Sequence, residues 1–413
     1  MKSILITLIN LCFCATFTFS QNIDYAKQVI AKLASPSFAG RGYTHNGVKK
    51  AAKFIEQELK KKDVNITIQN FNFDVNTFPS KMKIKIDGKE LLAGEDYLVD
   101  PKSPSCKGKY ELIWIDSSSV NQLNKLQPYY LSDKFMVIDT VGIKDKQLKM
   151  TLATAFESNF FGAAGIIEIT DKKLVYTVSC SVATFPFIQI KRNSINRKSL
   201  YVELKVKNKF IKNYETENII ALLSGKTDTC IVFTAHYDHL GNMGRQTYFP
   251  GAHDNASGVA TVLDLINECK KLNSKYSFAF IFFSGEEAGL LGSEHFVAHP
   301  LLSLKKMKFL INLDLLGSGE QGIKVVNGTI FKDKFDLLTQ INNEKKQLKK
   351  IEIRGAARNS DHYYFYQQGV PCFFIYTLGA YVEYHNIYDR AESLPLPVYN
   401  QFINLMLDFV KKL

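Results

Sequence analysis

Short apolar runs alternate with longer segments of helical periodicity throughout the C-terminal half of the chain. The apolar runs lie at residues 231–234, 278–283, 309–313 and 370–376, and the helical segments at residues 256–272, 290–298 and 331–345. An uninterrupted apolar run predicts a strand that is buried on both faces, as in a parallel sheet covered by helices. The pattern therefore predicts an α/β fold, with a largely parallel, mixed sheet sandwiched by helices.

The N-terminal half has a different texture, in which helical and strand patterns come in shorter pieces. Helices are predicted at residues 23–33, 47–62 and 152–162, and strands at residues 65–73, 82–86, 110–115, 135–139, 165–169 and 187–190. No stretch between residues 100 and 206 concentrates histidine with carboxylates. We therefore predict an inserted, smaller α+β domain at 100–206, between an N-terminal part (21–99) and the main part (207–413) of a larger domain.

The first twenty residues have the pattern of a signal peptide. Lys2 precedes an apolar run at residues 4–19, and small residues stand just before Gln21. The run is short and no basic stop signal follows it, so a lasting membrane anchor is the weaker reading. Cys12 and Cys14 lack the small-residue pattern that lipid attachment needs. The sequence thus predicts export to the periplasm, cell surface or medium, with no stable membrane insertion after cleavage.

Charge and cysteine content exclude two classes of function. The 413 residues carry a formal charge of +12, or +11 without Lys2. The basic residues are mostly scattered lysines, with only 7 arginines, so we predict a solvated basic surface and no nucleic-acid partner. The cysteines that follow the leader are Cys106, Cys180, Cys230, Cys269 and Cys372. Without a C-x-x-C spacing they indicate neither a zinc ribbon nor a redox motif, and their pairing stays open.

Metal-binding side chains follow the predicted strands. His236 and Asp238 come after the first strand of the C-terminal half, Glu286 and Glu287 after the second, Asp314 after the third and His385 after the last, while Asp254 precedes a helix in a glycine-flanked turn. In open α/β sheets ligands bind outside the carboxyl ends of the strands, so one pocket can collect these side chains. Nitrogen and oxygen ligands without sulfur suit zinc.

The charges of this set favour two zinc ions over one. The carboxylates of Asp254, Glu287 and Asp314 balance two divalent ions once a bridging hydroxide is added, and Asp254 is the candidate bridge. Glu286 is then the general base, which moves the water proton to the leaving amine. Asp238 is placed to accept the second ring N–H of His236. Each residue alone has an ordinary explanation, such as helix capping. Chance is a poor explanation for five ligand-type residues in order after successive strands.

At these residues the sequence resembles the co-catalytic zinc aminopeptidases and glutamate carboxypeptidases, which include secreted bacterial leucyl aminopeptidases. The matching segments are AHYDHLG (235–241), GAHDNASG (251–258), FSGEEAGLLGS (283–293), NLD (312–314) and SDH (360–362) leading to His385, with further likeness at GRG (40–42) and ENIIALLSG (217–225). The resemblance implies a zinc-exopeptidase fold. It places His236 and Asp314 on one zinc, Glu287 and His385 on the other, Asp254 across both, and Glu286 as general base. The insert is similar to a protease-associated domain, mainly through FGAAGII (161–167).

The predicted function is a dizinc aminopeptidase whose partners are peptide substrates. A glutaminyl cyclase with one zinc on the same fold is the enzymatic alternative, and a catalytically silent binding protein is the other. The complete ligand set and Glu286 argue against both. The preferred terminal residue, the choice between amino- and carboxypeptidase, the physiological metal and the oligomeric state stay open. So does the residue that supports the oxyanion, among Tyr381, Tyr384 and His362.

Overall fold

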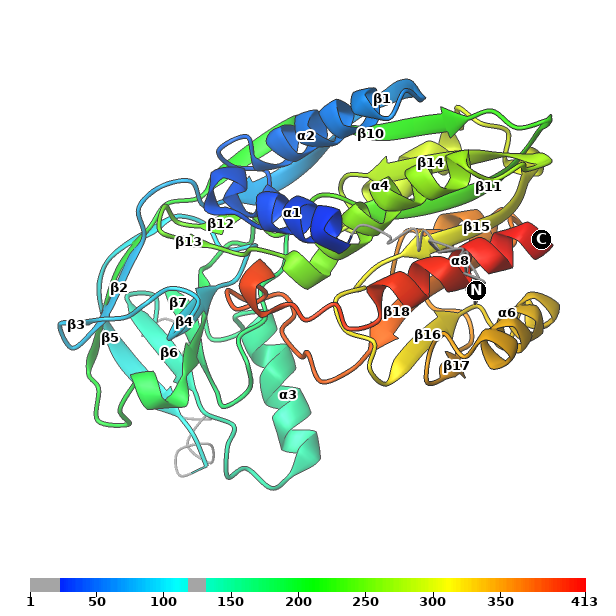
Figure 1. Cartoon of the computed structure of the whole chain (residues 1–413). Helices are drawn as coiled ribbons and strands as arrows, with labels where there is room; N and C mark the ends of the chain where they lie inside the picture. Colours follow the sequence, from blue (N-terminus) through cyan, green and yellow to red (C-terminus); the bar gives the residue numbers. More distant parts are fainter. Residues whose placement is uncertain (1–22, 118–130) are drawn as a thin grey trace, which may run out of the picture.

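The computed structural model describes residues 23–117 and 131–413, arranged around two large sheets (Figure 1). The predicted signal peptide, residues 1–20, lies outside the described residues. None of the described helices combines the length and apolar composition that a membrane crossing requires.

The larger sheet has eight strands in the order β1-β10-β14-β11-β15-β18-β16-β17. Its strands are β1 (Asn65–Thr77), β10 (Lys209–Leu223), β11 (Thr227–His236), β14 (Tyr276–Phe283), β15 (Met307–Leu313), β16 (Gly322–Val326), β17 (Ile351–Ile353) and β18 (Cys372–Leu378). The four central strands β14, β11, β15 and β18 are parallel. β1 pairs antiparallel with β10, β10 with β14 and β16 with β18, while β16 and β17 are parallel. The predicted α/β fold with a mixed, largely parallel sheet is confirmed.

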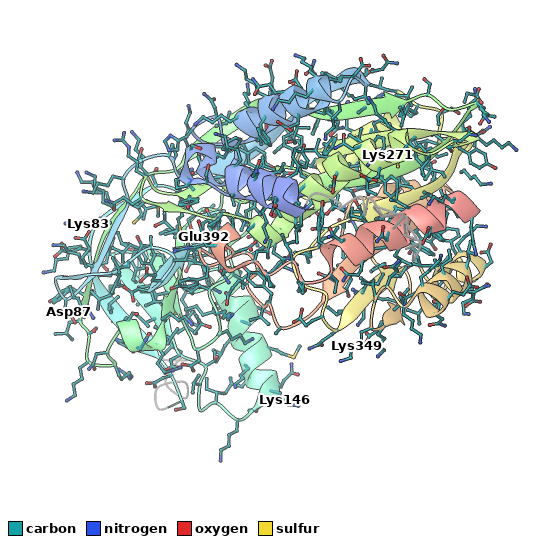
Figure 2. All side chains as sticks on the ribbon, in the orientation of Figure 1. Lys83, Asp87, Lys146, Lys271, Lys349 and Glu392 are labelled. Carbon is teal, nitrogen blue, oxygen red and sulfur yellow. The ribbon has the colours of Figure 1, made fainter. Side chains whose placement is uncertain are left out.

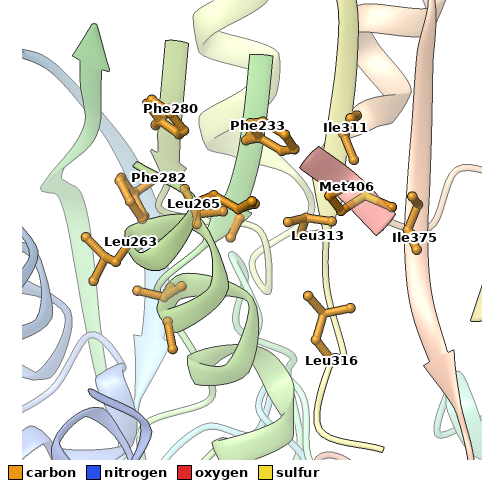
Figure 3. Close-up of a cluster of buried hydrophobic side chains, with 14 of the residues drawn as sticks. Phe233, Leu263, Leu265, Phe280, Phe282, Ile311, Leu313, Leu316, Ile375 and Met406 are labelled. Carbon is orange, nitrogen blue, oxygen red and sulfur yellow. The ribbon is translucent and has the colours of Figure 1, made fainter. Parts of the chain in front are cut away.

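Helices cover both faces of this sheet. One face carries α1 (Ile23–Leu33), α2 (Gly47–Lys61), α4 (Ser257–Lys270), α6 (Lys332–Lys345) and α8 (Tyr399–Lys412), and the other carries α5 (Leu291–Ala298) and α7 (His362–Gln367). Strand β14 contributes side chains to the hydrophobic cores on both faces of the sheet. Phe280 and Phe282 point to the α4 side, where Leu263 and Met406 also lie (Figure 3), while Ile281 belongs to the opposite core. Side chains alternate along a strand, so a run of apolar residues fills two cores at once.

The second sheet also has eight strands, in the order β3-β2-β9-β5-β6-β7-β8-β4. Its elements are β2 (Lys83–Ile86), β3 (Lys89–Glu90), β4 (Tyr97–Val99), β5 (Cys106–Ile115), β6 (Lys134–Ile138), α3 (Lys146–Glu157), β7 (Gly165–Thr170), β8 (Phe187–Lys191) and β9 (Tyr201–Val206). Strands β2, β3 and β4 precede the boundary predicted at residue 100. They belong to this sheet because β2 pairs with β9 and β4 with β8, and a local sequence pattern does not reveal such distant partners.

The two sheets are joined by a shared apolar cluster. One face of the second sheet packs against Leu240, Met243, Phe249 and Ile387, which follow strands of the larger sheet. Tyr176, from the segment between β7 and β8, stacks on Phe249 with ring centroids 4.5 Å apart. A small two-stranded sheet, β12 (Asn242–Met243) and β13 (Thr247–Tyr248), carries part of this contact.

One buried carboxyl group in the helical layer makes the stability depend on pH. Asp264 of α4 is 2% exposed and accepts a hydrogen bond from the hydroxyl of Tyr399 in α8 at 3.1 Å. Burial raises the pKa of Asp264 to about 6. The folded protein therefore binds this proton more tightly than the unfolded chain, and the charged form lowers stability above the folded pKa.

We predict that Asp264→Asn raises the free energy of unfolding at pH 7 by about 2 kcal/mol, since the amide keeps the Tyr399 bond without the charge. The gain should shrink as the pH falls from about 6 toward the ordinary Asp pKa of about 4. Urea denaturation of both proteins at several pH values measures it. Asp333→Asn, at a carboxylate that is 75% exposed, is the control and should change stability little. A gain that is constant with pH would contradict the explanation.

Candidate metal centre

Polar side chains gather at one edge of the larger sheet. Strands β14, β11, β15 and β18 are parallel neighbours, so their carboxyl ends lie along the same edge. His236 is the last residue of β11, Glu286 and Glu287 follow β14, Asp314 directly follows β15, His385 follows β18, and Asp254 lies in the π-helical turn before α4. The structure thus brings together the candidate ligands that the sequence distributes over 150 residues.

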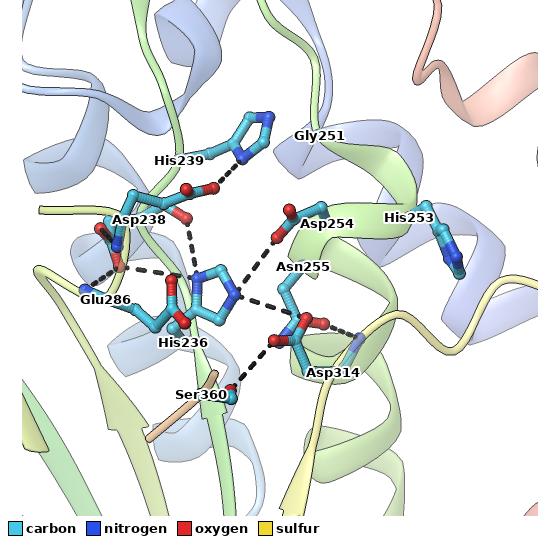
Figure 4. Close-up of polar contacts among 12 residues, drawn as sticks. His236, Asp238, His239, Gly251, His253, Asp254, Asn255, Glu286, Asp314 and Ser360 are labelled. Carbon is cyan, nitrogen blue, oxygen red and sulfur yellow. Dashed lines mark hydrogen bonds and ion pairs between the residues drawn. The ribbon is translucent and has the colours of Figure 1, made fainter. Parts of the chain in front are cut away.

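The carboxylate of Asp254 lies between two imidazole rings. Its Oδ1 is 3.2 Å from Nε2 of His236 (Figure 4), and its Oδ2 is 2.9 Å from Nε2 of His385. Asp254 is only 3% exposed. A carboxylate that presents one oxygen to each of two histidines is arranged to bridge two cations.

A second carboxylate accompanies each histidine. Nε2 of His236 is 3.5 Å from Oδ1 of Asp314, and Nε2 of His385 is 3.2 Å from Oε2 of Glu287. The five side chains therefore form two histidine–carboxylate pairs with Asp254 between them. These are the two pairs that the family resemblance implies.

Asp314 is fixed through one oxygen only. Its Oδ2 accepts a hydrogen bond from the Ser360 hydroxyl at 3.1 Å, and that hydroxyl in turn accepts one from the Asn312 amide at 2.8 Å. The other oxygen, Oδ1, is buried and accepts no hydrogen bond from any described residue. A buried carboxylate oxygen without a donor is costly, so its orientation toward His236 fits a position that a cation would share.

Glu287 is oriented by a histidine to which the sequence assigned no special role. Nδ1 of His239 is 2.6 Å from Oε1 of Glu287. Because this contact occupies Oε1, the other oxygen, Oε2, is turned toward His385. His239, Asp254 and Glu287 also have donor atoms within 4.8 Å of one another. His239 is therefore part of the site, and only its place directly after a predicted ligand strand hinted at this.

Asp238 organises the loop that carries Glu286. Its carboxylate accepts hydrogen bonds from the backbone amides of Glu286 and Glu287, each at 3.3 Å, and from the Tyr43 hydroxyl at 2.6 Å. The sequence predicted instead that this carboxylate receives the second ring N–H of His236. Nδ1 of His236 lies nearer to the backbone oxygen of Asp238, at 3.3 Å, than to its Oδ1, at 3.7 Å. Asp238 thus touches both partners, but its side chain mainly holds the 284–287 turn.

A fully buried arginine holds the turn that bears Asp254. The Arg41 guanidinium donates to the carbonyl oxygens of Pro250, Gly251 and Asp254 at 2.7, 2.8 and 3.0 Å. It also donates to the carbonyl oxygens of Tyr237 and Leu33. Burial lowers the pKa of Arg41 to about 10, so it remains a cation at neutral pH. In the sequence, the only sign of this role was the pair of glycines that flank Arg41. The structure shows why a glycine is needed there, since a Cβ at Gly42 would lie 2.2 Å from a backbone atom of Gly241.

Asp389 holds the same turn through its amides. Its carboxylate accepts hydrogen bonds from the backbone N–H groups of His253 and Asp254, at 2.8 and 3.1 Å. The Tyr381 hydroxyl donates to Asp389 Oδ1 at 3.1 Å, which ties this tyrosine to the support of the turn. Carbonyls bound by Arg41 and amides bound by Asp389 together fix the backbone at Asp254.

The site concentrates negative charge away from water. Burial alone would raise the pKa of Asp254, but hydrogen bonds with His236 and His385 outweigh it and hold that pKa well below its usual range. Burial would lower the pKa of His385, yet Glu287 and Asp254 raise it to about 11. Burial also raises the pKa of Glu286 well above its usual range, and the carboxylates beside it add to the effect. Such a cluster favours cations among its side chains.

Several other histidines lie apart from the cluster. His253 points away from His236 (Figure 4), and its Nδ1 accepts the Gly317 N–H at 2.9 Å. His295 packs against the rings of His299 and Phe71. His362 is buried against Phe374, and burial lowers its pKa to about 3, so its ring is neutral.

The segment between β7 and β8 of the second sheet reaches the site. The Tyr176 N–H donates to the His385 carbonyl oxygen at 2.9 Å, and the Cys180 thiol lies 3.5 Å from the carbonyl oxygen of Ala288. Lys173 forms an ion pair with Glu383 at 2.8 Å. The second sheet therefore contacts both of the loops that carry Glu287 and His385.

Comparison with known sequences identifies relatives among peptidases. Residues 218–410 match the sequence model of peptidase family M28. The chain is 26% identical to aminopeptidase YwaD of Bacillus subtilis (strain 168) over 278 residues, which cover 65% of this chain and 57% of that protein. It is 33% identical to leucine aminopeptidase 1 of Trichophyton rubrum over 132 residues, or 29% and 35% of the two chains. The chain thus spans little more than half of YwaD.

Solved structures share the fold over nearly the whole chain. A zinc aminopeptidase from Bacillus subtilis superposes with a TM-score of 0.71 at 22% identity and covers 94% of both chains. An aminopeptidase from Aneurinibacillus sp. strain AM-1 gives 0.66 at 23% identity and covers 95% of this chain and 94% of its own. Glutaminyl cyclase of Porphyromonas gingivalis gives 0.52 at 12% identity, with 94% and 97% covered. From β10 to α8, residues 218–410, this chain is thus similar in sequence to peptidase family M28, and the chain as a whole shares the fold of these aminopeptidases.

Proposed function

We propose that the protein is an exported, metal-dependent aminopeptidase that binds two zinc ions and removes N-terminal residues from peptides, with Glu286 as general base. The observation that carries the proposal is the position of Asp254, whose two oxygens each face a different histidine. The similarity to aminopeptidases and the match to peptidase family M28 support the reaction class.

The donor set suits two divalent cations. His236, Asp314 and one oxygen of Asp254 would hold the first ion, and His385, Glu287 and the other oxygen of Asp254 the second. Imidazole nitrogen with carboxylate oxygen is a set that zinc prefers. Bound zinc would polarise the scissile carbonyl and make a water easier to deprotonate.

Glu286 is the group that moves the proton. Its carboxylate has an oxygen within 4.8 Å of donor atoms of His236 and Asp314, yet its backbone is held by Asp238 rather than by either ligand. A raised pKa suits a carboxylate that accepts a proton from the attacking water and then donates it to the leaving amine. The proton lost by water thus ends on the new N-terminus of the shortened peptide.

Tyr384 is our candidate for stabilising the oxyanion. Its ring stacks on His385 with centroids 3.8 Å apart, and the side chain is 44% exposed. Burial raises the pKa of Tyr384, so its hydroxyl keeps its proton and can donate a hydrogen bond. Tyr381 is committed to Asp389, and His362 is buried against Phe374.

A glutaminyl cyclase is the second candidate, because a cyclase shares the fold. It needs a substrate with N-terminal glutamine and releases ammonia without cutting the chain. Residues 1–20 are proposed as a cleaved signal peptide, and the second sheet, residues 83–206, as a protease-associated-like insert that begins before the predicted boundary at residue 100. The test of function is a panel of free and N-blocked peptides, including N-terminal glutamine, assayed with the zinc-loaded mature protein. Release of the first residue from free peptides only supports the proposal, whereas cyclised glutamine without cleavage would replace it.

We predict that Glu286→Gln lowers kcat by about 100- to 10,000-fold, because the amide cannot accept the water proton. KM and the metal content should stay close to those of the parent. Steady-state kinetics with metal analysis measures both. Glu294→Gln, at an exposed carboxylate in α5, is the matched control and should keep the parent rate. Loss of metal in the Glu286 variant would instead make Glu286 a ligand.

We predict that Asp254→Asn weakens both metal positions at once, because it changes the one carboxylate that faces both histidines. Titration of the chelator-stripped protein with zinc, followed by calorimetry, should show two ions per chain for the parent and fewer than two at the same free zinc concentration for the variant. Asp314→Asn should weaken one position and leave the other. If the two variants lose the same single ion, Asp254 does not bridge.

We predict that Arg41→Lys lowers the free energy of unfolding by about 2–4 kcal/mol. Lysine keeps the charge, but it lacks the planar guanidinium whose N–H groups donate to several carbonyl oxygens at once. The variant should also bind zinc more weakly, because the Asp254 turn loses its support. Denaturation without metal separates the two effects. Arg192→Lys, at a guanidinium that is 37% exposed and paired with Asp139, should cost under about 1 kcal/mol. Equal losses at both positions would show that Arg41 has no special role.

A further inference from the structure

The outer face of the second sheet carries lysines in direct register across three strands. Lys83 of β2 lies opposite Lys205 of β9, and Lys205 lies opposite Lys107 of β5. The next row consists of Lys85, Glu203 and Lys109. We call these six positions the lysine face.

The lysine face is unfavourable for folding alone. Directly opposed side chains on one face of an antiparallel pair have Cβ atoms about 5 Å apart, and like charges there are destabilising. Glu90 forms an ion pair with Lys83 at 3.2 Å, and the Lys109 ammonium lies 4.5 Å from the centre of the Tyr201 ring. Within the part of the chain that the structure describes, Lys107 and Lys205 form no ion pair. Five lysines and one glutamate thus leave this face with a net positive charge.

The face is open and slightly hollow. The lysine side chains, with Gly108 and Leu204, line a concavity of about 240 Å³. The inward residues of the same strands, such as Ile84 and Val202, fill the apolar core, which fixes the direction of the lysines. Helix α3 packs on the β5–β6–β7 part of the sheet, and no described helix covers the β2–β9 part.

The lysine face points away from the loops of the metal centre, because the inward side of the same strands packs against Leu240 and Met243. Lys83 and Asp87 project at one extremity (Figure 2), and β2 and β3 lie farthest from α8 in Figure 1. The β7–β8 segment contacts the metal-site loops, and strands β7 and β8 lie toward the other end of the sheet from β2. A ligand on the lysine face would therefore leave the peptide site accessible.

We propose that the lysine face binds a linear anionic polysaccharide and so holds the peptidase on a carboxylated or sulfated matrix. Ammonium groups act as point charges that suit dispersed anions, whereas base recognition uses arginine forks, which these positions lack. The one exposed ring that adjoins them, Tyr201, is occupied by the Lys109 ammonium and is a single ring, not a row on which bases could stack. Membrane docking would need apolar side chains among them, and the outward positions are lysine and glutamate. The choice of a polysaccharide rests on the proposed export, and the binding itself is independent of the proposed peptidase activity.

The test compares two triple variants of the full mature chain. Lys83→Gln, Lys107→Gln and Lys205→Gln together remove the row, and Lys345→Gln, Lys346→Gln and Lys349→Gln remove the same charge from an exposed run at the end of α6. Binding to polygalacturonate and dextran sulfate, with neutral dextran as blank, is measured by fluorescence anisotropy over a range of salt. We expect the row variant to bind about tenfold more weakly with a shallower salt dependence, and the α6 variant to bind as the parent does.

Two further readouts keep the outcome clear. Peptide hydrolysis should be unchanged in both variants, and the Tm of the row variant should be equal to or above that of the parent, since like charges are relieved. Equal weakening in both variants would overturn the proposal in favour of diffuse net charge. Binding of the parent to phosphatidylglycerol vesicles or single-stranded DNA, but to neither polysaccharide, would also overturn it. Failure of peptide cleavage with row-dependent polysaccharide binding would refute the proposed function alone.

Discussion

The placement of one carboxylate between two histidines is the constraint on which the rest of the site depends. Asp254 must be withdrawn from water to face His236 and His385 together, and its charge then has to be balanced inside the protein. The neighbouring carboxylates increase the need for positive charge instead of relieving it. The donor atoms favour cations held among these carboxylates, and such cations would balance the buried negative charge. The cost of burying the carboxylates is thus linked to the metal chemistry that they support.

The backbone around the site is fixed by charged side chains that are themselves no candidate ligands. Arg41 donates hydrogen bonds to the carbonyl oxygens of the Asp254 turn, and Asp389 accepts hydrogen bonds from its amides. Asp238 accepts hydrogen bonds from the amides of the Glu286 turn. Charge-assisted hydrogen bonds are stronger than neutral ones and have defined directions. Loops that would otherwise be free to move thus hold their side chains at separations that metal binding requires. Arg41 comes from before α2, so the N-terminal segment is part of this support.

The sequence allowed the proximity of the candidate ligands to be predicted, because the carboxyl ends of neighbouring parallel strands lie along the same edge of a sheet. His236 ends a strand of this sheet, and Asp314 and Glu287 follow strands of it. Applying this rule requires no knowledge of distant strand pairing. Other features depend on contacts between remote segments. His239 differs from an ordinary buried histidine only through Glu287, and β2 joins the second sheet only because β9 follows more than a hundred residues later. Local patterns contain neither fact, so the sequence could not supply them.

The second sheet has two distinct surfaces, one packed against the loops that follow strands of the larger sheet and one open to solvent. Its inner face shares a core with Met243, Phe249 and Ile387, so it cannot swing freely without exposing apolar side chains. The Tyr176 N–H of the second sheet's β7–β8 segment donates to the backbone carbonyl of His385. A displacement of the sheet would therefore shift a residue of the candidate metal centre. The lysine face is the opposite, outward face of strands β2, β9 and β5, whose inward side chains, such as Ile84 and Val202, belong to this same core. A polymer bound there would fix the position of the protein, while the packed inner face keeps the loops of the candidate metal centre in place.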